Sequence, residues 1–263
     1  MATIVAITNQ KGGACKTTTA AAMASVLSQK GKRVLAVDLD AQGNLSEAFG
    51  MFVEDGMATV FDCLAGDVDV RDAIRTRTAE DGSKLDLLSS DLNLSAVEMR
   101  LSGTPNPDNR LKLILGPVID DYDWVILDCP PSLNLCVRMA LTAADYAIVP
   151  VKPARWHVRG LTYLDEVVKM VRKYSNPRLK VLGVLVVLYH PNFSISKSYI
   201  DVMTMAAQQM DAVCFESKIR EATEAEWAAH SGVPITEYNP SSNPACDYRA
   251  FVDEVVARVE EGR

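Results

Sequence analysis

Short apolar runs rich in β-branched residues alternate with amphipathic segments along almost the whole chain of 263 residues. Several runs are apolar at nearly every position, which is typical of strands covered on both faces. Strand and helix signals that alternate in this way predict a parallel sheet whose strands are joined by right-handed helical crossovers. We therefore expect an α/β fold with a doubly wound, mostly parallel sheet and helices on both faces, formed by a single domain over residues 1–263.

The periodicity also predicts where the elements lie. The expected strands are 3–8, 33–40, 84–90, 124–129, 146–151, 181–189 and 212–215. The expected helices are 16–30, 94–102, 108–120, 134–144, 158–174, 196–210, 220–231 and 246–261. Residues 103–109 and 239–245 are expected to be loops, because Gly, Pro and Asn concentrate there.

Composition narrows the functional classes. The net charge of −7 argues against nucleic-acid binding over the whole surface, but it allows a basic patch on one face. The six cysteines form no C-x-x-C and no short cluster with histidine, so a zinc or iron–sulfur site within one chain is not expected. Scattered cysteines fit a reducing cytosol, and no apolar run approaches the ~20 residues that span a bilayer. We expect a cytoplasmic protein.

The segment NQKGGACKTTT, residues 9–19, joins the first expected strand to the first expected helix. Backbone N–H groups of a Gly-bearing loop in this position, together with the helix dipole, attract an anion. Lys16 would reach the β- and γ-phosphates of a nucleotide, and the Thr17 hydroxyl would bind Mg²⁺. The loop departs from the usual G-x-x-x-x-G-K-[ST] pattern, because Gln10 and Cys15 stand where that pattern has glycine.

Two further expected strands end in carboxylates. RVLAVDLDAQGN carries Asp38 and Asp40 at a strand end, where a side chain points into the ligand crevice of a parallel sheet. Asp, Gly and Asn also favour ordinary turns, so this segment alone does not decide between the two readings. DYDWVILDCPPSL carries Asp128 after four apolar residues, a pattern that presents one carboxylate to a magnesium shell.

The motifs K-G-G-x-x-K-T-T-T, D-L-D-x-Q-G-N and D-x-P-P-S together resemble those of the ParA/MinD family of deviant Walker-type ATPases, and the resemblance covers essentially the whole chain. It implies a P-loop NTPase fold, ATP and Mg²⁺ as cofactors, and an ATP sandwich homodimer. In this family position 10 need not be glycine, so Gln10 is no defect. The residues that the resemblance assigns to the nucleotide are Lys11, Gly12, Gly13, Ala14, Cys15, Lys16, Thr17, Thr18, Asp128 and Pro130.

The resemblance also distributes roles within the site. Lys11, the family's signature lysine, would reach the phosphates bound by the partner subunit. Asp40, in the switch I segment, would orient or activate the attacking water. The expected catalytic residues are therefore Lys11, Lys16 and Asp40, and the expected metal residues are Thr17, Asp38 and Asp128.

Cys15 departs from the family, which has glycine there. The P-loop backbone at this point needs a conformation that glycine adopts most easily, and a non-Gly residue costs on the order of 1 kcal/mol. We expect Cys15, whether natural or introduced, to modulate ATP handling without abolishing the site. A thiol beside a lysine and a helix N-terminus also predicts a lowered pKa and a reactive cysteine.

The expected cargo is plasmid or chromosome DNA, with a ParB-like centromere-binding partner that stimulates hydrolysis and a nucleoid-associated location. The C-terminal segment YRAFVDEVVARVEEGR is amphipathic with an acidic polar face, so membrane targeting is not expected. A second basic group occupies 169–180, whereas Glu221, Glu224 and Glu226 weaken the DNA prediction. The residues expected to bind DNA non-specifically are Lys197, Lys218, Arg220 and Arg249.

Two alternatives remain open at this point. One is a ParA-like ATPase that positions a cargo other than DNA. The other is a nucleotide-binding regulator whose hydrolysis is impaired by Cys15. His157 is expected at the surface or in the dimer interface.

Overall fold

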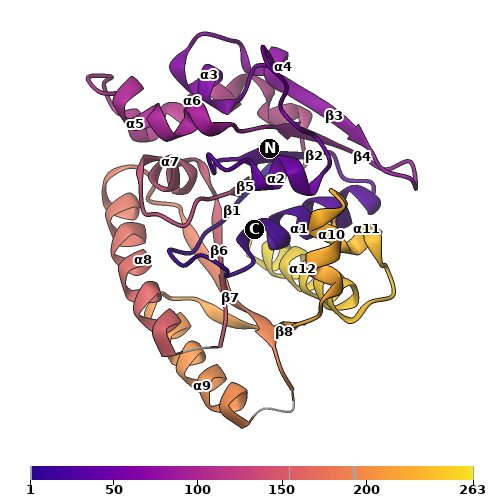
Figure 1. Cartoon of the computed structure of the whole chain (residues 1–263). Coiled ribbons are helices and arrows are strands. Elements are labelled where there is room, and N and C mark those ends of the chain that lie inside the picture. Colours follow the sequence, from indigo (N-terminus) through magenta and orange to yellow (C-terminus); the bar gives the residue numbers. More distant parts are fainter. Residues whose placement is uncertain (1, 154, 192–193, 263) are drawn as a thin grey trace.

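An eight-stranded sheet runs through the middle of the computed structural model, in the order β3-β4-β2-β5-β1-β6-β7-β8 (Figure 1). The structure describes residues 2–153, 155–191 and 194–262, without the side chains of 155–159 and 194–198. All neighbouring strands are parallel except the antiparallel pair β3–β4. The strands are β1 (Thr3–Ile7), β2 (Val34–Asp38), β3 (Ile74–Thr78), β4 (Lys84–Leu88), β5 (Trp124–Asp128), β6 (Tyr146–Val151), β7 (Lys180–Tyr189) and β8 (Val213–Arg220).

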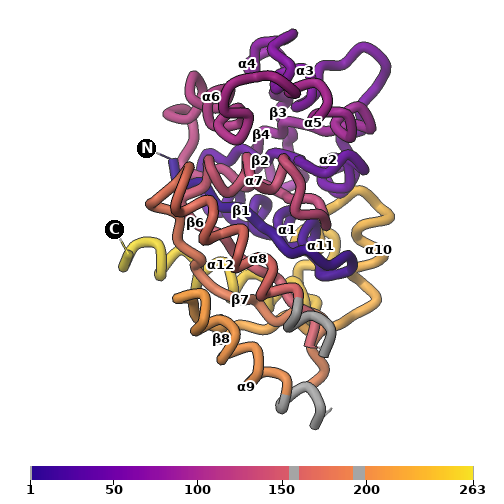
Figure 2. The backbone as a smooth tube through the Cα atoms, turned by 90° about the vertical axis from the view of Figure 1, so that its left-hand side faces the viewer, coloured from indigo at the N-terminus to yellow at the C-terminus, as the bar shows by residue number. Residues whose placement is uncertain are grey.

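Helices cover both faces of this sheet (Figures 1 and 2). One core layer packs α1, α2 and α10–α12 against the sheet, and the other packs α3–α9 against the opposite face. This confirms the expected doubly wound, mostly parallel α/β fold. The helices are α1 (Lys16–Gln29), α2 (Asn44–Ala48), α3 (Val60–Ala65), α4 (Val70–Ala73), α5 (Val97–Arg100), α6 (Arg110–Leu115), α7 (Leu135–Ala143), α8 (Arg155–Tyr174), α9 (Ser194–Gln209), α10 (Glu224–His230), α11 (Ile235–Tyr238) and α12 (Asn243–Glu261).

Every expected strand forms, but several features differ from the sequence prediction, and the short helices α2, α3, α4 and α11 were not expected. β3, with the sequence IRTRT, was not expected, because its alternating Arg and Thr residues give no apolar run. β8 continues to Arg220, so the helix expected from residue 220 begins only at Glu224. The expected helices 94–102 and 108–120 are each divided between a short α-helix and 3₁₀ turns. α12 begins at Asn243, inside an expected loop, because Pro is well accommodated in the first helical turn.

The register of the central strands determines where the expected nucleotide site lies. In the parallel ladders, Asp128 at the end of β5 is paired with Ile7 on one side and with Asp38 on the other. Because these three carboxyl-terminal strand ends share one row, the loops that follow β1, β2 and β5 meet at one edge of the sheet. Ligands of open parallel sheets bind at that edge. Among the described residues, no helix is long and apolar enough to cross a bilayer.

Gly183 in β7 gives a test of the packing between β7 and β8. A Cβ atom added there would lie 2.6 Å from Phe215 Cε2, and the Phe215 ring is itself held edge-to-face against Phe251 at 5.1 Å. Gly183→Ala should therefore lower the free energy of unfolding by about 1–3 kcal/mol, as overpacked core positions do. Chemical denaturation measures this change.

Lys180→Ala is the control, because Lys180 lies at an exposed position of the same strand. The control should stay within about 0.5 kcal/mol of the native chain. Equal stability of both variants would show that the Phe215 ring is free to move away.

Candidate nucleotide site

The loop after β1 is fastened to β6 before it reaches the helix. The Thr8 N–H donates to Ile148 O at 3.0 Å, and the Asn9 side-chain amide donates to Pro150 O at 2.6 Å. The other Asn9 side-chain atom, Oδ1, accepts the Lys11 N–H at 3.1 Å. Asn9 thus fixes the start of the loop, a role that the sequence analysis missed. Its signal was a polar residue that directly follows a buried strand.

Cys15 immediately precedes α1 and adopts the left-handed conformation, with φ 52° and ψ 33°. This is the conformation that the sequence analysis expected at the position where the family has glycine. The left-handed region costs a non-Gly residue roughly 1–2 kcal/mol. The structure therefore locates the backbone strain of this loop at Cys15.

The expectation of a reactive Cys15 thiol is wrong. Burial raises the pKa of this thiol to about 11, although the charges of Lys152 and Lys16 act in the opposite direction. The Cys15 side chain is half-buried and packs against the core layer that includes α1 and α12. The sequence showed the neighbouring lysine and the helix N-terminus, but it did not show the desolvation that outweighs them.

Two lysines of the loop occupy different environments. Lys16 is buried, and its Nζ lies 3.4 Å from Lys11 O, inside the loop. Lys11 is exposed, beside α8: a Cβ added to Gly160 of that helix would lie 3.6 Å from Lys11 Cγ. Lys16 is thus placed to meet phosphates in its own loop, whereas the Lys11 side chain is available at the surface.

Asp38 is fully buried and holds the switch I segment. Its Oδ2 accepts the N–H of Leu45 at 3.1 Å, and both the N–H and the hydroxyl of Ser46 at 3.0 and 3.1 Å. Its Oδ1 accepts the Asp40 N–H at 3.1 Å. Burial raises the Asp38 pKa to about 6, against the effect of these donors. Asp38 therefore orients Asp40 and α2, while its expected place near magnesium stays a prediction.

The Asp128 carboxylate has different surroundings from the Asp38 carboxylate. It is fully buried, and neither carboxylate oxygen has a hydrogen-bond partner among the described residues. Burial and the neighbouring Asp38 raise its pKa well above the usual range, and Thr17 and Lys16 offset part of this rise. A carboxylate and a hydroxyl are oxygen ligands of the kind that Mg²⁺ prefers. Asp128 and Thr17 therefore fit the expected magnesium ion, and Pro130 follows in the same buried turn.

The residues expected to bind DNA make contacts within the chain. Arg220 donates two hydrogen bonds to Asp247, at 2.9 and 2.7 Å. Arg249 donates to two main-chain carbonyls, Pro240 O at 2.6 Å and Thr236 O at 2.7 Å. Lys218 donates to Glu216 O at 3.0 Å. The side chains of Lys197 and His157 lie outside the described residues, and all these roles stay predictions.

Known proteins resemble this chain along nearly its full length. A family model described as an AAA domain matches residues 2–181. The sporulation initiation inhibitor protein Soj of Bacillus subtilis is 36% identical over 98% of this chain and 99% of its own length. The chromosome partitioning protein ParA of Caulobacter vibrioides is 34% identical over 97% of this chain and 94% of its own length.

A solved structure agrees with these relatives. Cobyrinic acid a,c-diamide synthase from Mycobacterium smegmatis, with bound ATP analog and magnesium, has a TM-score of 0.87 and 30% identity, over 100% of this chain and 97% of that one. The sequence relatives and the structural neighbour both cover the segments of the chain that build the site described above. This chain belongs to the ParA/Soj/MinD family of deviant Walker-type ATPases.

Proposed function

We propose that this protein is a Mg²⁺-dependent ATPase that partitions plasmid or chromosome DNA as an ATP sandwich homodimer. The observation that carries the ATPase proposal is the buried Asp128 carboxylate beside Thr17 and Lys16, at the row where β1, β2 and β5 end, with no hydrogen bond within 3.5 Å among the described residues. The names of the relatives Soj and ParA support chromosome partition as the process. We propose a cytoplasmic, nucleoid-associated protein with a ParB-like partner.

Different residues of the proposed site would bind ATP, hold magnesium, orient water and sense the partner subunit. Loop N–H groups of Gly12 to Thr18 and the Lys16 ammonium bind the phosphates of ATP. Thr17 and Asp128 would hold a magnesium ion, which would neutralise phosphate charge. Asp38 keeps the switch I backbone in place, so that the Asp40 carboxylate can orient the attacking water. Lys11 crosses to the phosphates of the partner subunit and thereby makes dimerisation depend on ATP.

A basic surface at the end of α8 supports the DNA part of the proposal. Arg220 and Arg249 are engaged within the chain, whereas Lys173, Arg178 and Lys180 are exposed. Lys173 Nζ lies 5.0 Å from the centre of the exposed Tyr174 ring, a mixture of cation and aromatic that suits a nucleic acid. The acidic net charge of −7 favours the alternative of a non-DNA cargo, so DNA binding needs a direct test.

Lys11→Ala tests the proposed function. The variant should still bind ATP through Lys16, but it should stay monomeric with ATP and hydrolyse it at least about tenfold more slowly, since a transition-state charge contact is lost. Analytical ultracentrifugation with a non-hydrolysable ATP analogue and a phosphate-release assay measure both effects. Lys32→Ala, an exposed lysine on another surface, is the control. A Lys11→Ala protein that dimerises like the native chain would refute the proposal.

Charge reversal on the α8 surface tests the DNA proposal. Lys173→Glu with Lys180→Glu should weaken ATP-dependent binding to random duplex DNA by about tenfold or more, and should flatten its dependence on salt. Lys32→Glu with Lys112→Glu, two exposed lysines on other surfaces, changes the net charge equally and is the control. Equal weakening by the control would remove this surface from the proposal, and no binding by the native chain at low salt would favour the non-DNA cargo.

Cys15→Gly tests whether Cys15 impairs hydrolysis. Glycine relieves the left-handed strain next to Lys16, so ATP turnover should rise by about two- to tenfold, the equivalent of a strain of the order of 1 kcal/mol. Steady-state ATPase assays measure the rate, and calorimetry measures ATP affinity. Equal rates in both proteins would show that the family fold tolerates Cys15 without cost, and would remove the argument for an impaired regulator.

A further inference from the structure

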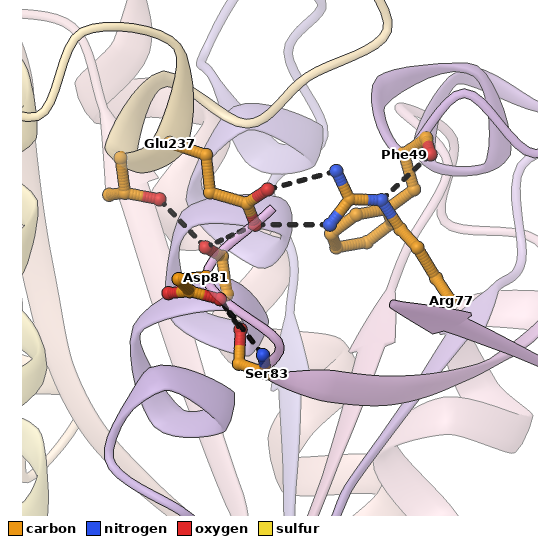
Figure 3. A network of polar contacts seen from close by, with 7 residues as sticks. Phe49, Arg77, Asp81, Ser83 and Glu237 are labelled. Atoms are coloured by element: carbon orange, nitrogen blue, oxygen red, sulfur yellow. Dashed lines mark hydrogen bonds and ion pairs between the residues drawn. The ribbon is translucent and has the colours of Figure 1, made fainter. Parts of the chain in front are cut away.

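The C-terminal end of α2 is held by the edge strand β3. Arg77 Nε donates to Phe49 O, the residue after α2, at 3.0 Å, and its guanidinium lies 5.5 Å from the centre of the Phe49 ring (Figure 3). Arg75, two residues earlier on the same face of β3, directs its guanidinium to Phe52 O at 3.2 Å. Two arginines of one strand thus hold carbonyl groups that follow the switch I helix.

The same Arg77 guanidinium is anchored from the far end of the chain. Its two terminal nitrogens donate to the two carboxylate oxygens of Glu237, in α11, at 3.1 and 2.9 Å. The side chains are only 14% and 11% exposed, so this two-point contact is largely shielded from water. Glu237 also accepts the Ser25 hydroxyl of α1 at 2.7 Å, and Ser25 accepts that of Thr236 at 3.0 Å. The arrangement leaves Arg77 a single well-defined position.

A second contact joins α2 to the segment before α11. Gly50 and Gly232 both have positive φ, 66° and 64°, and their backbones meet closely. A Cβ added to Gly232 would lie 3.1 Å from both Glu47 O and Gly50 Cα. A side chain at Gly232 would therefore push against the C-terminal end of α2. Helix α2 is thus seated between β3 and the α10–α11 connection.

We propose that Arg77 and Glu237, which we call the α2 clasp, are positioning residues for ATP hydrolysis. Helix α2 spans only Asn44–Ala48, too short to be stable by itself, so its ends decide where it lies. Its N-terminal end donates to Asp38, and Asp38 in turn holds the Asp40 N–H. The clasp at the C-terminal end fixes the remaining freedom of α2. It acts on Asp40 through α2 and Asp38, without contact to ATP.

This inference rests on the proposed ATPase function, and it predicts a specific kinetic signature. Arg77→Lys keeps the positive charge but cannot bind Glu237 at two points and Phe49 O at the same time. We expect kcat to fall by about fivefold or more while KM for ATP stays within about twofold, because the P-loop is untouched. Gly232→Ala, which disturbs the same end of α2 from another side, should give the same signature.

Arg258→Lys is the matched control. Arg258 also donates twice to a glutamate, Glu254, and lies 5.7 Å from the centre of a phenylalanine ring, Phe215, but these contacts join α12 to itself and to β8 instead of to α2. Its kcat should change by less than about twofold. If Arg258→Lys and Arg77→Lys lower kcat equally, or if both Arg77→Lys and Gly232→Ala leave kcat unchanged, the clasp has no positioning role and the proposal is overturned.

Hydrogen exchange separates failure of the clasp from failure of the proposed function. Amides of residues 44–50 should exchange faster in Arg77→Lys than in the native chain, with those of α1 unchanged, in full-length protein without nucleotide. If the native chain hydrolyses no ATP but this exchange result holds, the ATPase proposal fails and the structural clasp stands. Unchanged exchange at 44–50 overturns the clasp even in an active enzyme.

Discussion

Asp38 and Asp128 end neighbouring strands in the same row of the sheet, and both are fully buried. Burial raises the pKa of each carboxyl, and their mutual repulsion adds to the rise at Asp128. Buried carboxylates are tolerated only when donors or a cation compensate them. Asp38 is compensated by switch I donors, whereas Thr17 and Lys16 are the groups that lower the Asp128 pKa among the described residues. This asymmetry joins the P-loop, switch I and the proposed magnesium site into one electrostatic unit.

The hydrogen-bond donors that stabilise the buried Asp38 carboxylate connect the site to more distant parts of the fold. Its donors belong to the start of α2, so the stability of a buried charge depends on the placement of a short helix. That helix is seated in turn on β3 and on the connection before α11, through Arg77, Glu237 and two closely packed glycines. Residues 160 positions apart thus act on the same switch segment. In this fold, the edge strand and the C-terminal segment both bear on the chemistry at the centre.

The sequence predicted seven of the eight strands and the strand ends that carry Asp38 and Asp128, because these rest on local pattern. The left-handed position at Cys15 was predicted from the family resemblance, since the family has glycine there. The sequence did not predict β3, whose arginines serve as side-chain anchors instead of core residues, nor the short helices α2, α3, α4 and α11, which have too few turns for a periodic signal. The predicted shift of the Cys15 thiol pKa had the wrong direction, for a different reason. Desolvation depends on packing against a core layer that includes α12, which lies more than two hundred residues further along the chain.

The two lysines of the loop lie in different environments, as the proposed function needs. Lys16 begins α1, is buried, and faces the interior of its own loop, where a phosphate would replace its contact with Lys11 O. Lys11 lies on the exposed side, with its backbone N–H fixed by Asn9 and its side chain beside Gly160. A fixed backbone under an exposed side chain suits the role proposed for Lys11 at a second subunit, since little freedom of the main chain is lost on contact. In the proposed function, the spacing of the two lysines would separate binding of ATP from its detection by the partner.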